Sequence, residues 1–214
     1  MLSAMSAVPQ EPGSQPHERH ETSFYVAGAR DGNVADLERL YERSLPALCV
    51  WIRARVTHGL RMQIDVEDLL QEVWLRALAG FARFDPERSS FRTWLIGIAK
   101  NVLLESLREA STSRGRLAAT GQSSILDRVP DSVTTLTRAV TRNDDVQHMH
   151  AFIAQLDEDE RALLLGHGIE GLTLSEIGLR LDVSAETAGK RWQRLVARLR
   201  DPAVWSNVLG PASA

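Results

Sequence analysis

The sequence has a single cysteine among its 214 residues, Cys49, so an internal disulfide is excluded. Cys49 lies within the apolar run at residues 48–52, which favours a buried structural thiol over a redox role. The six histidines are scattered. His148 and His150 lie close together, but no cysteine or second histidine pair lies at metal-ligand spacing from them. The sequence therefore predicts neither a metal site nor a bound cofactor.

Long apolar runs are also missing, since no stretch approaches the roughly 20 residues that a membrane-spanning helix needs. Residues 1–20 lack the basic start and the apolar centre of a secretory signal. Hydrophobic residues make up 43% of the chain and charged residues 25%, which is ordinary for a soluble globular protein. We therefore expect a cytoplasmic protein without membrane insertion, with a disordered tail over residues 1–22.

The sequence shows no internal repeat and no sustained alternation typical of strands, whereas helical spacing of apolar residues recurs. These patterns predict an all-α protein of two small helical domains joined by a flexible linker. The first domain spans residues 23–109 and includes a helix that restarts at Pro46, because proline is tolerated in a first helical turn. The linker spans residues 110–145, where at most a short helical turn is expected, around Val133, Leu136 and Val140. A helix-turn-helix follows at residues 146–200, and residues 201–214 form a tail.

Residues 65–109 contain the most informative segment, which opens with an amphipathic helix. Its apolar positions have the spacing of one buried helix face: Val66, Leu69, Leu70, Val73, Trp74, Ala77, Leu78 and Phe81. Carboxylates gather in its first two turns, at Asp65, Glu67, Asp68 and Glu72, where negative charge suits the helix dipole. Capping and solubility account for Asp65 but explain the others less well. A catalytic or metal-binding cluster is disfavoured because no histidine, nucleophile or glycine-rich loop is nearby, so no enzyme activity is expected.

The net charge of −3 argues at first sight against a nucleic-acid partner, but the charge is segregated. Residues 180–200 contain six basic and two acidic residues, a local balance of +4. Thr173 or Ser175 can cap one helix, Asp182 suits a left-handed turn, and Ser184 can cap the next helix. The inner face of that second helix is predicted at Ala188, Trp192, Leu195 and Leu199, which leaves the basic residues to face solvent or a polyanion. An ordinary helix pair with a solvated basic face has the same pattern.

Two blocks of the sequence resemble the bacterial sigma factors of the sigma-70 family. The stretch DVEDLLQEVWLRAL is similar to the helix that binds core RNA polymerase, and FDPERSSFRTWLIGIAKN resembles the promoter-melting segment. The stretch from residue 156 to residue 200 is similar to the carboxy-terminal helix-turn-helix of the same family. Because both blocks occur in the family's order and no middle domain fits between them, the resemblance is to the extracytoplasmic-function (ECF) group.

The resemblance implies a sigma factor that binds core RNA polymerase and directs transcription initiation by recognising and opening promoter DNA, in duplex and melted form. It implies polymerase-binding residues at Asp65, Glu67, Asp68, Gln71 and Glu72. It implies contacts to the minus-ten element at Phe84, Arg88, Ser89, Ser90, Arg92, Lys100 and Asn101. It implies contacts to the minus-thirty-five element at Ser184, Thr187, Lys190, Arg191, Arg194 and Arg198. The group also leads us to expect an anti-sigma factor as a partner, although no residue identifies one.

Two departures and one alternative accompany this interpretation. Ala188 and Gly189 stand where the family usually has a bulky apolar residue and lysine, and a glycine inside a helix costs up to about 1 kcal/mol relative to alanine. Individual base contacts therefore do not transfer directly. The alternative is a stand-alone helix-turn-helix regulator that binds duplex DNA without polymerase, which uses residues 180–200 equally well but leaves residues 65–109 unexplained.

Overall fold

The computed structural model describes residues 24–56, 64–112 and 131–201. All regular secondary structure in these ranges is helical, which confirms the all-α prediction. Residues 24–30 are helical, and α2 (Val34–Arg55), α3 (Val66–Gly80) and α4 (Phe91–Thr112) follow. After α6 (Asp131–Thr141) and α7 (Asp144–Gln155), the chain forms α8 (Glu158–Leu163), η3 (Leu164–Ile169), α9 (Leu174–Arg180) and α10 (Ala185–Arg200). A short 3-10 turn, η1 (Phe81–Arg83), separates α3 from the loop before α4.

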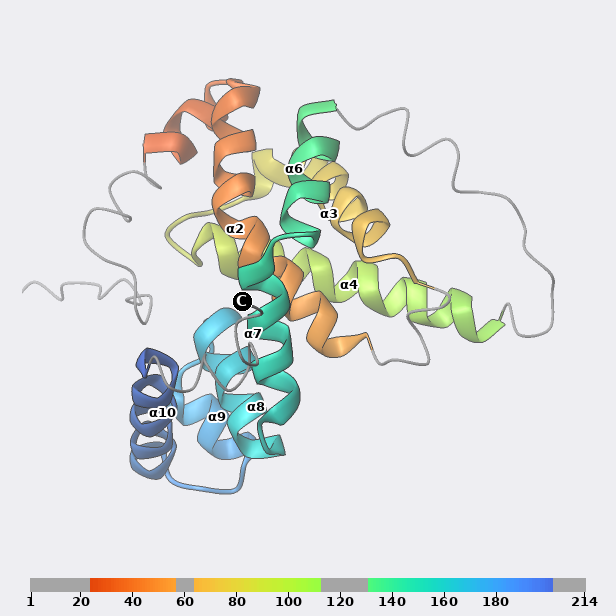
Figure 1. Cartoon of the computed structure of the whole chain (residues 1–214). Coiled ribbons are helices and arrows are strands. Elements are labelled where there is room, and N and C mark those ends of the chain that lie inside the picture. The colour runs from red at the N-terminus through yellow and green to blue at the C-terminus, as the bar shows by residue number, and fades with distance from the viewer. Residues whose placement is uncertain (1–23, 57–63, 113–130, 202–214) are drawn as a thin grey trace, which may run out of the picture.

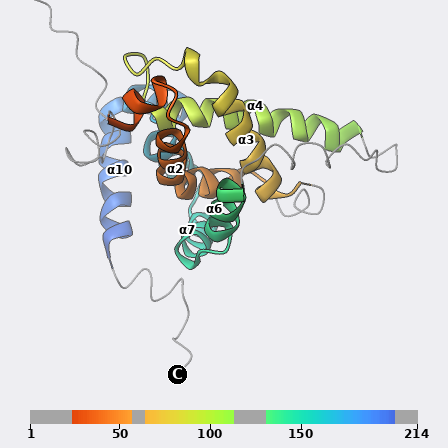
Figure 2. The same ribbon diagram turned by 90° about the horizontal axis from the view of Figure 1, so that it is seen from above.

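The helices form two units, which Figure 1 shows one above the other. In the amino-terminal unit, α2 packs against both α3 and α4, and these two helices pack against each other. In the carboxy-terminal unit, α10 packs against α9 and α8. Helix α7 runs between the units and packs along α2, and the view from above in Figure 2 places α10 to one side of α2. The predicted division into two helical domains is therefore confirmed.

Helix α2 passes through Pro46 without interruption, so the predicted restart at this proline is wrong. An interior proline removes one helical hydrogen bond and ordinarily costs about 3 kcal/mol or more. Here Pro46 is exposed, so water can reach the carbonyl that lost its donor. Buried residues on both sides of it, including Tyr41 and Leu48, line one continuous face, and burying that face as a single helix offsets the cost.

Helix α6 lies in the second half of the segment that was predicted as a flexible linker. It is 11 residues long and packs against both α2 and α3. Its buried face includes Val133 and Thr137, and the Thr137 hydroxyl donates to the Val133 carbonyl at 2.8 Å. The helical turn expected around Val133 is therefore a packed helix, and only the two residues Arg142 and Asn143 separate it from α7.

Candidate functional site

The acidic helix α3 begins as the sequence predicts. The Asp65 side chain accepts a hydrogen bond from the Glu67 amide at 2.7 Å, so it caps the helix and remains exposed. Asp68 is half-buried next to these two carboxylates. Burial, together with repulsion from Asp65 and Glu67, raises the pKa of the Asp68 carboxyl above its usual range. A carboxylate held in this way would be stabilised by a cationic partner.

Two of the residues predicted to contact polymerase are covered within the chain. Glu67 accepts a hydrogen bond from the Thr141 hydroxyl of α6 at 2.8 Å, and Arg138 of α6 lies 3.9 Å from its carboxylate. Gln71 lies one helical turn further along the same face and is only 4% exposed. Its Oε1 atom has no hydrogen-bond partner among the described residues. In this conformation Gln71 cannot contact another protein, contrary to the exposed position expected for it.

Ion pairs join the second half of α3 to α4. Arg76 pairs with Glu72 one turn earlier and with Glu105 of α4, each at 2.6 Å. Arg76 holds the pKa of the Glu105 carboxyl below its usual range, mainly through the hydrogen bond between them. Glu72 is thus positioned by an ion-pair network on the outer side of the unit. It remains partly exposed and able to meet a partner.

The predicted minus-ten residues separate into core, capping and exposed positions. Phe84 is 3% exposed and packs against Phe81, Phe91 and Trp94, with ring centroids 5.2–5.8 Å apart, so it is a core residue and cannot stack on a base here. The Ser90 hydroxyl accepts from the Thr93 amide at 3.1 Å and so caps α4. The remaining positions lie at least partly at the surface: Arg88, Ser89, Arg92, Lys100 and Asn101.

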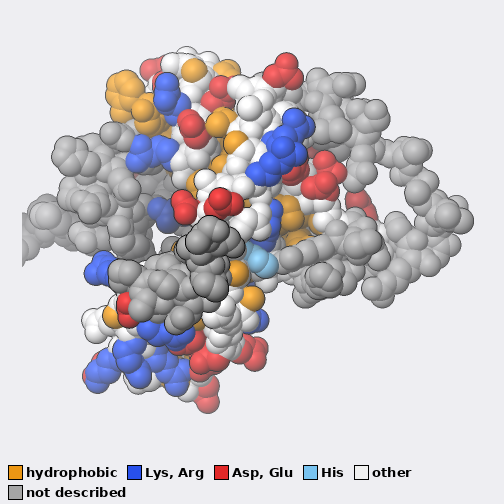
Figure 3. Space-filling view, in the orientation of Figure 1, with side chains coloured by type: hydrophobic (Ala, Val, Ile, Leu, Met, Phe, Trp, Pro, Cys, Tyr) orange, Lys and Arg blue, Asp and Glu red, His pale blue; other side chains and the backbone are white. Residues whose placement is uncertain are grey.

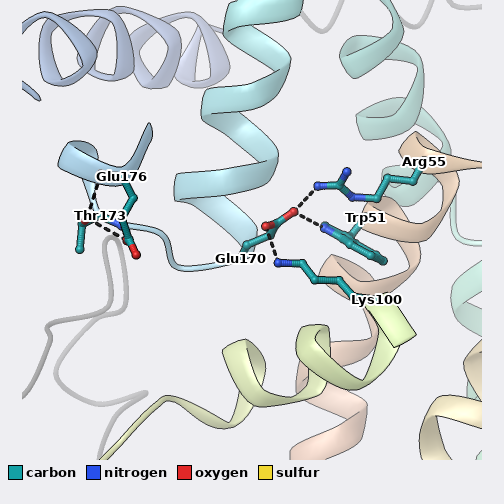
Figure 4. Close-up of polar contacts among 6 residues, drawn as sticks. All are labelled: Trp51, Arg55, Lys100, Glu170, Thr173 and Glu176. Atoms are coloured by element: carbon teal, nitrogen blue, oxygen red, sulfur yellow. Dashed lines mark hydrogen bonds and ion pairs between the residues drawn. The ribbon is translucent and has the colours of Figure 1, made fainter. Parts of the chain in front are cut away.

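Lys100 belongs to an ion-pair cluster that the sequence did not reveal. Its Nζ atom lies 2.7 Å from Glu170, which follows η3 in the carboxy-terminal unit. The Glu170 carboxylate also accepts from Trp51 Nε1 at 2.8 Å and from Arg55, whose guanidinium lies over the Trp51 ring. Figure 4 shows the three donors from α2 and α4 converging on the one carboxylate. We call Trp51, Arg55, Lys100 and Glu170 the Glu170 cluster.

Burial and charge compete within the Glu170 cluster. Glu170 is 2% exposed, and burial alone would raise the pKa of its carboxyl. Hydrogen bonds from Lys100 and Trp51 and the charge of Arg55 outweigh burial, so the pKa of Glu170 lies below its usual range. The carboxylate is therefore ionised and holds the two units together. A buried glutamate between Ile169 and Gly171 gave no sequence signal, because its partners lie 70 to 119 residues away.

The helix-turn-helix formed by α9 and α10 confirms the predicted caps and turn. Thr173 and Glu176 form a reciprocal capping box at the start of α9. Asp182 has φ of 52°, the left-handed angle expected at the turn. Ser184 caps α10 by accepting from the Thr187 amide at 3.1 Å. Ala188 and Leu195 are buried on the inner face of α10, which leaves the opposite side of this helix exposed.

The basic residues of α10 fall into two classes. Lys190 and Arg194 are exposed, and Lys190 pairs with Glu186 of its own helix at 2.6 Å. Arg191 pairs with Asp159 at 2.5 Å, and Arg198 pairs with Glu160, so both also fasten α10 to α8. Figure 3 shows the resulting basic patch at the lower left, over α10. Lys190 and Arg194 are the side chains most available to an external anion.

Within the described residues, no group of three or more metal-ligating side chains is found. Those residues also include no helix long and apolar enough to cross a bilayer.

Comparisons with known proteins match both units. The family model for Sigma-70 region 2 covers residues 40–112, and that for Sigma-70, region 4 covers residues 152–201. The ECF RNA polymerase sigma factor SigX of Bacillus subtilis is 32% identical over 120 residues, which are 56% of this chain and 61% of SigX. The ECF RNA polymerase sigma factor SigE of Mycolicibacterium smegmatis is 30% identical over 139 residues, 65% of this chain and 52% of SigE.

A third relative is covered more fully. The ECF RNA polymerase sigma factor SigC of Mycobacterium tuberculosis is 31% identical over 137 residues, 64% of this chain and 67% of SigC. The aligned parts thus span about half to two thirds of the length of these relatives. A solved structure titled "Structure of CnrH in complex with the cytosolic domain of CnrY" matches with a TM-score of 0.43 and 21% identity, over 90% of this chain and 99% of that one.

Proposed function

We propose that this chain, which belongs to the ECF group of the sigma-70 family of RNA polymerase sigma factors, binds core RNA polymerase and directs it to promoter DNA. The observation that carries the proposal is the presence in one chain of two surfaces of opposite charge, one in each helical unit. One is the carboxylate-rich start of α3, and the other is the exposed basic face of α10. A stand-alone DNA-binding regulator needs only the second.

Asp68 and Glu72 are the best-supported polymerase contacts. Asp68 is held among repelling carboxylates, so a basic surface on the polymerase would relieve the repulsion. Glu72 is oriented by Arg76 and keeps part of its surface exposed. Glu67 and Gln71 join this interface only if α6 leaves α3, because α6 engages Glu67 and Gln71 is buried here.

On the DNA side, Lys190 and Arg194 are proposed to contact the minus-thirty-five element from α10. Arginine can donate two hydrogen bonds to a guanine edge, and either cation can pair with phosphate. Arg88, Lys100 and Asn101 are proposed to contact the minus-ten element from the loop before α4 and from α4 itself. The Asn101 amide is exposed and offers both a donor and an acceptor to an unpaired base.

The proposed mechanism is binding without covalent chemistry. Two DNA-binding surfaces on one chain, one in each unit, contact two elements of the same DNA. The first contact therefore raises the effective concentration of the second surface at its element. The melted state is stabilised when unstacked bases and the single-strand backbone are held by aromatic, polar and cationic side chains. The expected inhibitor is an anti-sigma factor that covers either DNA-binding surface. The proposed site of action is the cytoplasm, where the polymerase works.

The test is start-site selection by core RNA polymerase on a genomic template library, with and without the full chain. We expect the chain to copurify with core polymerase and to give defined transcript starts. The variant Asp68→Lys should lose copurification while remaining folded, because lysine at this position is attracted to the neighbouring carboxylates rather than repelled by them. Glu42→Lys, at an exposed position of α2, is the matched control and should bind as the wild type does.

Retention of polymerase by the Asp68→Lys variant would remove α3 from the interface. DNA binding by the wild type without any polymerase capture would instead favour the stand-alone regulator.

A further inference from the structure

We propose that Arg30 is a positioning residue for promoter opening, because it fixes the shape of the loop before α4. This loop, residues 84–90, is called the minus-ten loop here, and it presents Arg88 and Ser89 at the surface. Arg30 is the last residue of the helix formed by residues 24–30. The inference rests on the proposed function and adds to it a residue that the sequence motifs did not identify.

The Arg30 guanidinium reaches the minus-ten loop at the first loop residue. Its Nη2 atom donates a hydrogen bond to the Phe84 carbonyl oxygen at 3.1 Å, across a separation of 54 residues in the chain. A hydrogen bond from a charged donor is stronger than one between neutral groups. Phe84 is 3% exposed, so water would replace this donor poorly if the bond were lost.

Phe84 is the residue at which the chain leaves the packed core and enters the minus-ten loop. Its ring packs against other aromatic rings of the core, and its amide donates to the Phe81 carbonyl at 2.9 Å. These contacts hold the ring and the amide side of the residue. The bond from Arg30 holds the carbonyl side, which continues into the loop. Because a peptide unit is planar, fixing the Phe84 carbonyl also fixes the orientation of the Asp85 amide.

Asp85 in turn organises the rest of the minus-ten loop. Its carboxylate accepts a hydrogen bond from the Glu87 amide at 3.0 Å. Its carbonyl oxygen accepts from the Arg88 amide at 3.2 Å and from the Ser89 amide at 3.3 Å. The orientation set at Phe84 therefore passes through a single residue to two side chains that are expected to contact the minus-ten element. A rotation of the Phe84 carbonyl would displace Arg88 and Ser89 together.

The backbone around Arg30 is itself well anchored. Val26, one helical turn earlier, is 6% exposed and belongs to the hydrophobic core. The helix ends in a Schellman motif, in which the Asn33 amide donates to the Gly28 carbonyl at 3.0 Å and Gly32 has φ of +87°. The Asn33 side chain then caps α2. Arg30 therefore extends only its side chain from a fixed frame and links the start of α2 to the minus-ten loop.

The support comes from outside the part of the chain that defines the family. The family model for region 2 begins at residue 40, so the helix at residues 24–30 lies before it. The acceptor is a backbone carbonyl, so the bond does not depend on which side chains the loop carries. The first helix can therefore fix the shape of the minus-ten loop whatever bases the loop contacts.

Three variants separate loop positioning from a direct contact between Arg30 and DNA. Arg30→Met removes the donor and the charge but keeps an unbranched side chain. Arg30→Lys keeps the charge and replaces the planar guanidinium by a shorter ammonium group. Arg39→Met, at an exposed position of α2, removes one positive charge from the same unit and is the matched control.

The first measurement is the NMR order parameter of the Arg88 and Ser89 amides in the full chain without polymerase or DNA. We expect about 0.85 in the wild type and in Arg39→Met, and less than about 0.6 in Arg30→Met, because the turn at Asp85 loses its support. Arg30→Lys should be intermediate and provides a milder change. A loop that stays rigid in folded Arg30→Met, or that is already flexible in the wild type, would overturn the inference whatever the chain does.

The second measurement uses core polymerase with the full chain, on a template obtained by start-site selection and carrying a single-stranded minus-ten element. We expect Arg30→Met to weaken this binding by about tenfold, the lower end of what a hydrogen bond to a charged group contributes. Polymerase capture and binding to a minus-thirty-five duplex should stay at the wild-type level. The slope of log K against log salt should equal that of the Arg39→Met control.

Two results of the second measurement would contradict the positioning role. A salt slope smaller by about 0.7 in Arg30→Met than in Arg39→Met would show that Arg30 itself pairs with a phosphate of the single strand. Full binding by Arg30→Lys with a flexible loop would show that charge, and not loop order, decides the affinity. Failure of the wild-type chain to select any start site would instead overturn the proposed function, and the order parameters would still decide whether Arg30 supports the loop.

Discussion

Two glycines of the helix-turn-helix give a sharp test of how far local preference decides stability. Gly178 lies in α9 and Gly189 in α10, and helix propensity alone predicts that alanine stabilises either position by about 1 kcal/mol. The surroundings of the two residues differ. A Cβ at Gly178 would lie 2.7 Å from the Val183 carbonyl oxygen and 3.3 Å from the Ala185 amide nitrogen, both of them backbone atoms. A Cβ at Gly189 meets only Leu174 Cδ1, at 3.4 Å.

The expected effects therefore have opposite signs. Overpacking against fixed atoms costs about 1–3 kcal/mol, so Gly178→Ala should be destabilising by up to about 2 kcal/mol after its propensity gain. Gly189→Ala should be stabilising by up to about 1 kcal/mol, because Leu174 can accommodate an ordinary contact. In a chain of this size each kcal/mol corresponds to about 2–4 °C in melting temperature.

Thermal and urea unfolding of the full chain would measure both changes, and amide hydrogen exchange in α9 and α10 would assign them to the helix-turn-helix. Binding of a minus-thirty-five duplex should weaken only in the Gly178→Ala variant, because its turn positions α10. Stabilisation by both substitutions would refute the reasoning, since it would mean that the turn at Val183 relaxes at little cost.

Two further predictions concern charge. Arg194→Ala should reduce the slope of log K against log salt for promoter binding by about one, whereas Arg191→Ala should reduce it less, because Asp159 already neutralises that guanidinium. Equal slope changes in filter-binding titrations would contradict this division of the basic residues. The pKa of Glu170 lies below its ordinary value of 4.5 in the folded chain. The contribution of its carboxylate to holding the two units together is therefore complete above pH 4.5 and is lost as the pH falls through the lowered pKa. Spin labels, one on each unit, should therefore move apart in acid in the wild type; a similar acid opening in Glu170→Gln would show that another group controls it.

Local signals predicted the caps and the turn correctly because each involves neighbours within a few residues. Asp65, Thr173 and Ser184 all cap helices through amides two or three positions away, and Asp182 adopts its angle as a single residue. Pro46 shows the limit of such signals. Its local preference favours a helix start, but the burial of a long shared face overrode it.

Phe84 and Gln71 show why the candidate site was predicted only in part. Both have side chains suited to a partner, an aromatic ring for a base and an amide for a protein surface. Their burial depends on residues that are remote in the chain or belong to other helices: Phe84 joins an aromatic cluster with α4, and Gln71 shares a face of α3 that α6 engages. A motif indicates the type of residue at a position, whereas exposure is set by packing.

The sequence by itself determined the all-α class, the helix caps, the segregation of acidic from basic residues and the family, because these depend on short-range spacing and residue type. Only the tertiary structure decided how the two units meet. Trp51 and Glu170 are 119 positions apart, and no periodicity or motif relates a buried carboxylate to donors at that separation. Their pairing follows from the way packed helices bring distant side chains into one low-dielectric interface, where a charge is stable only beside its partners.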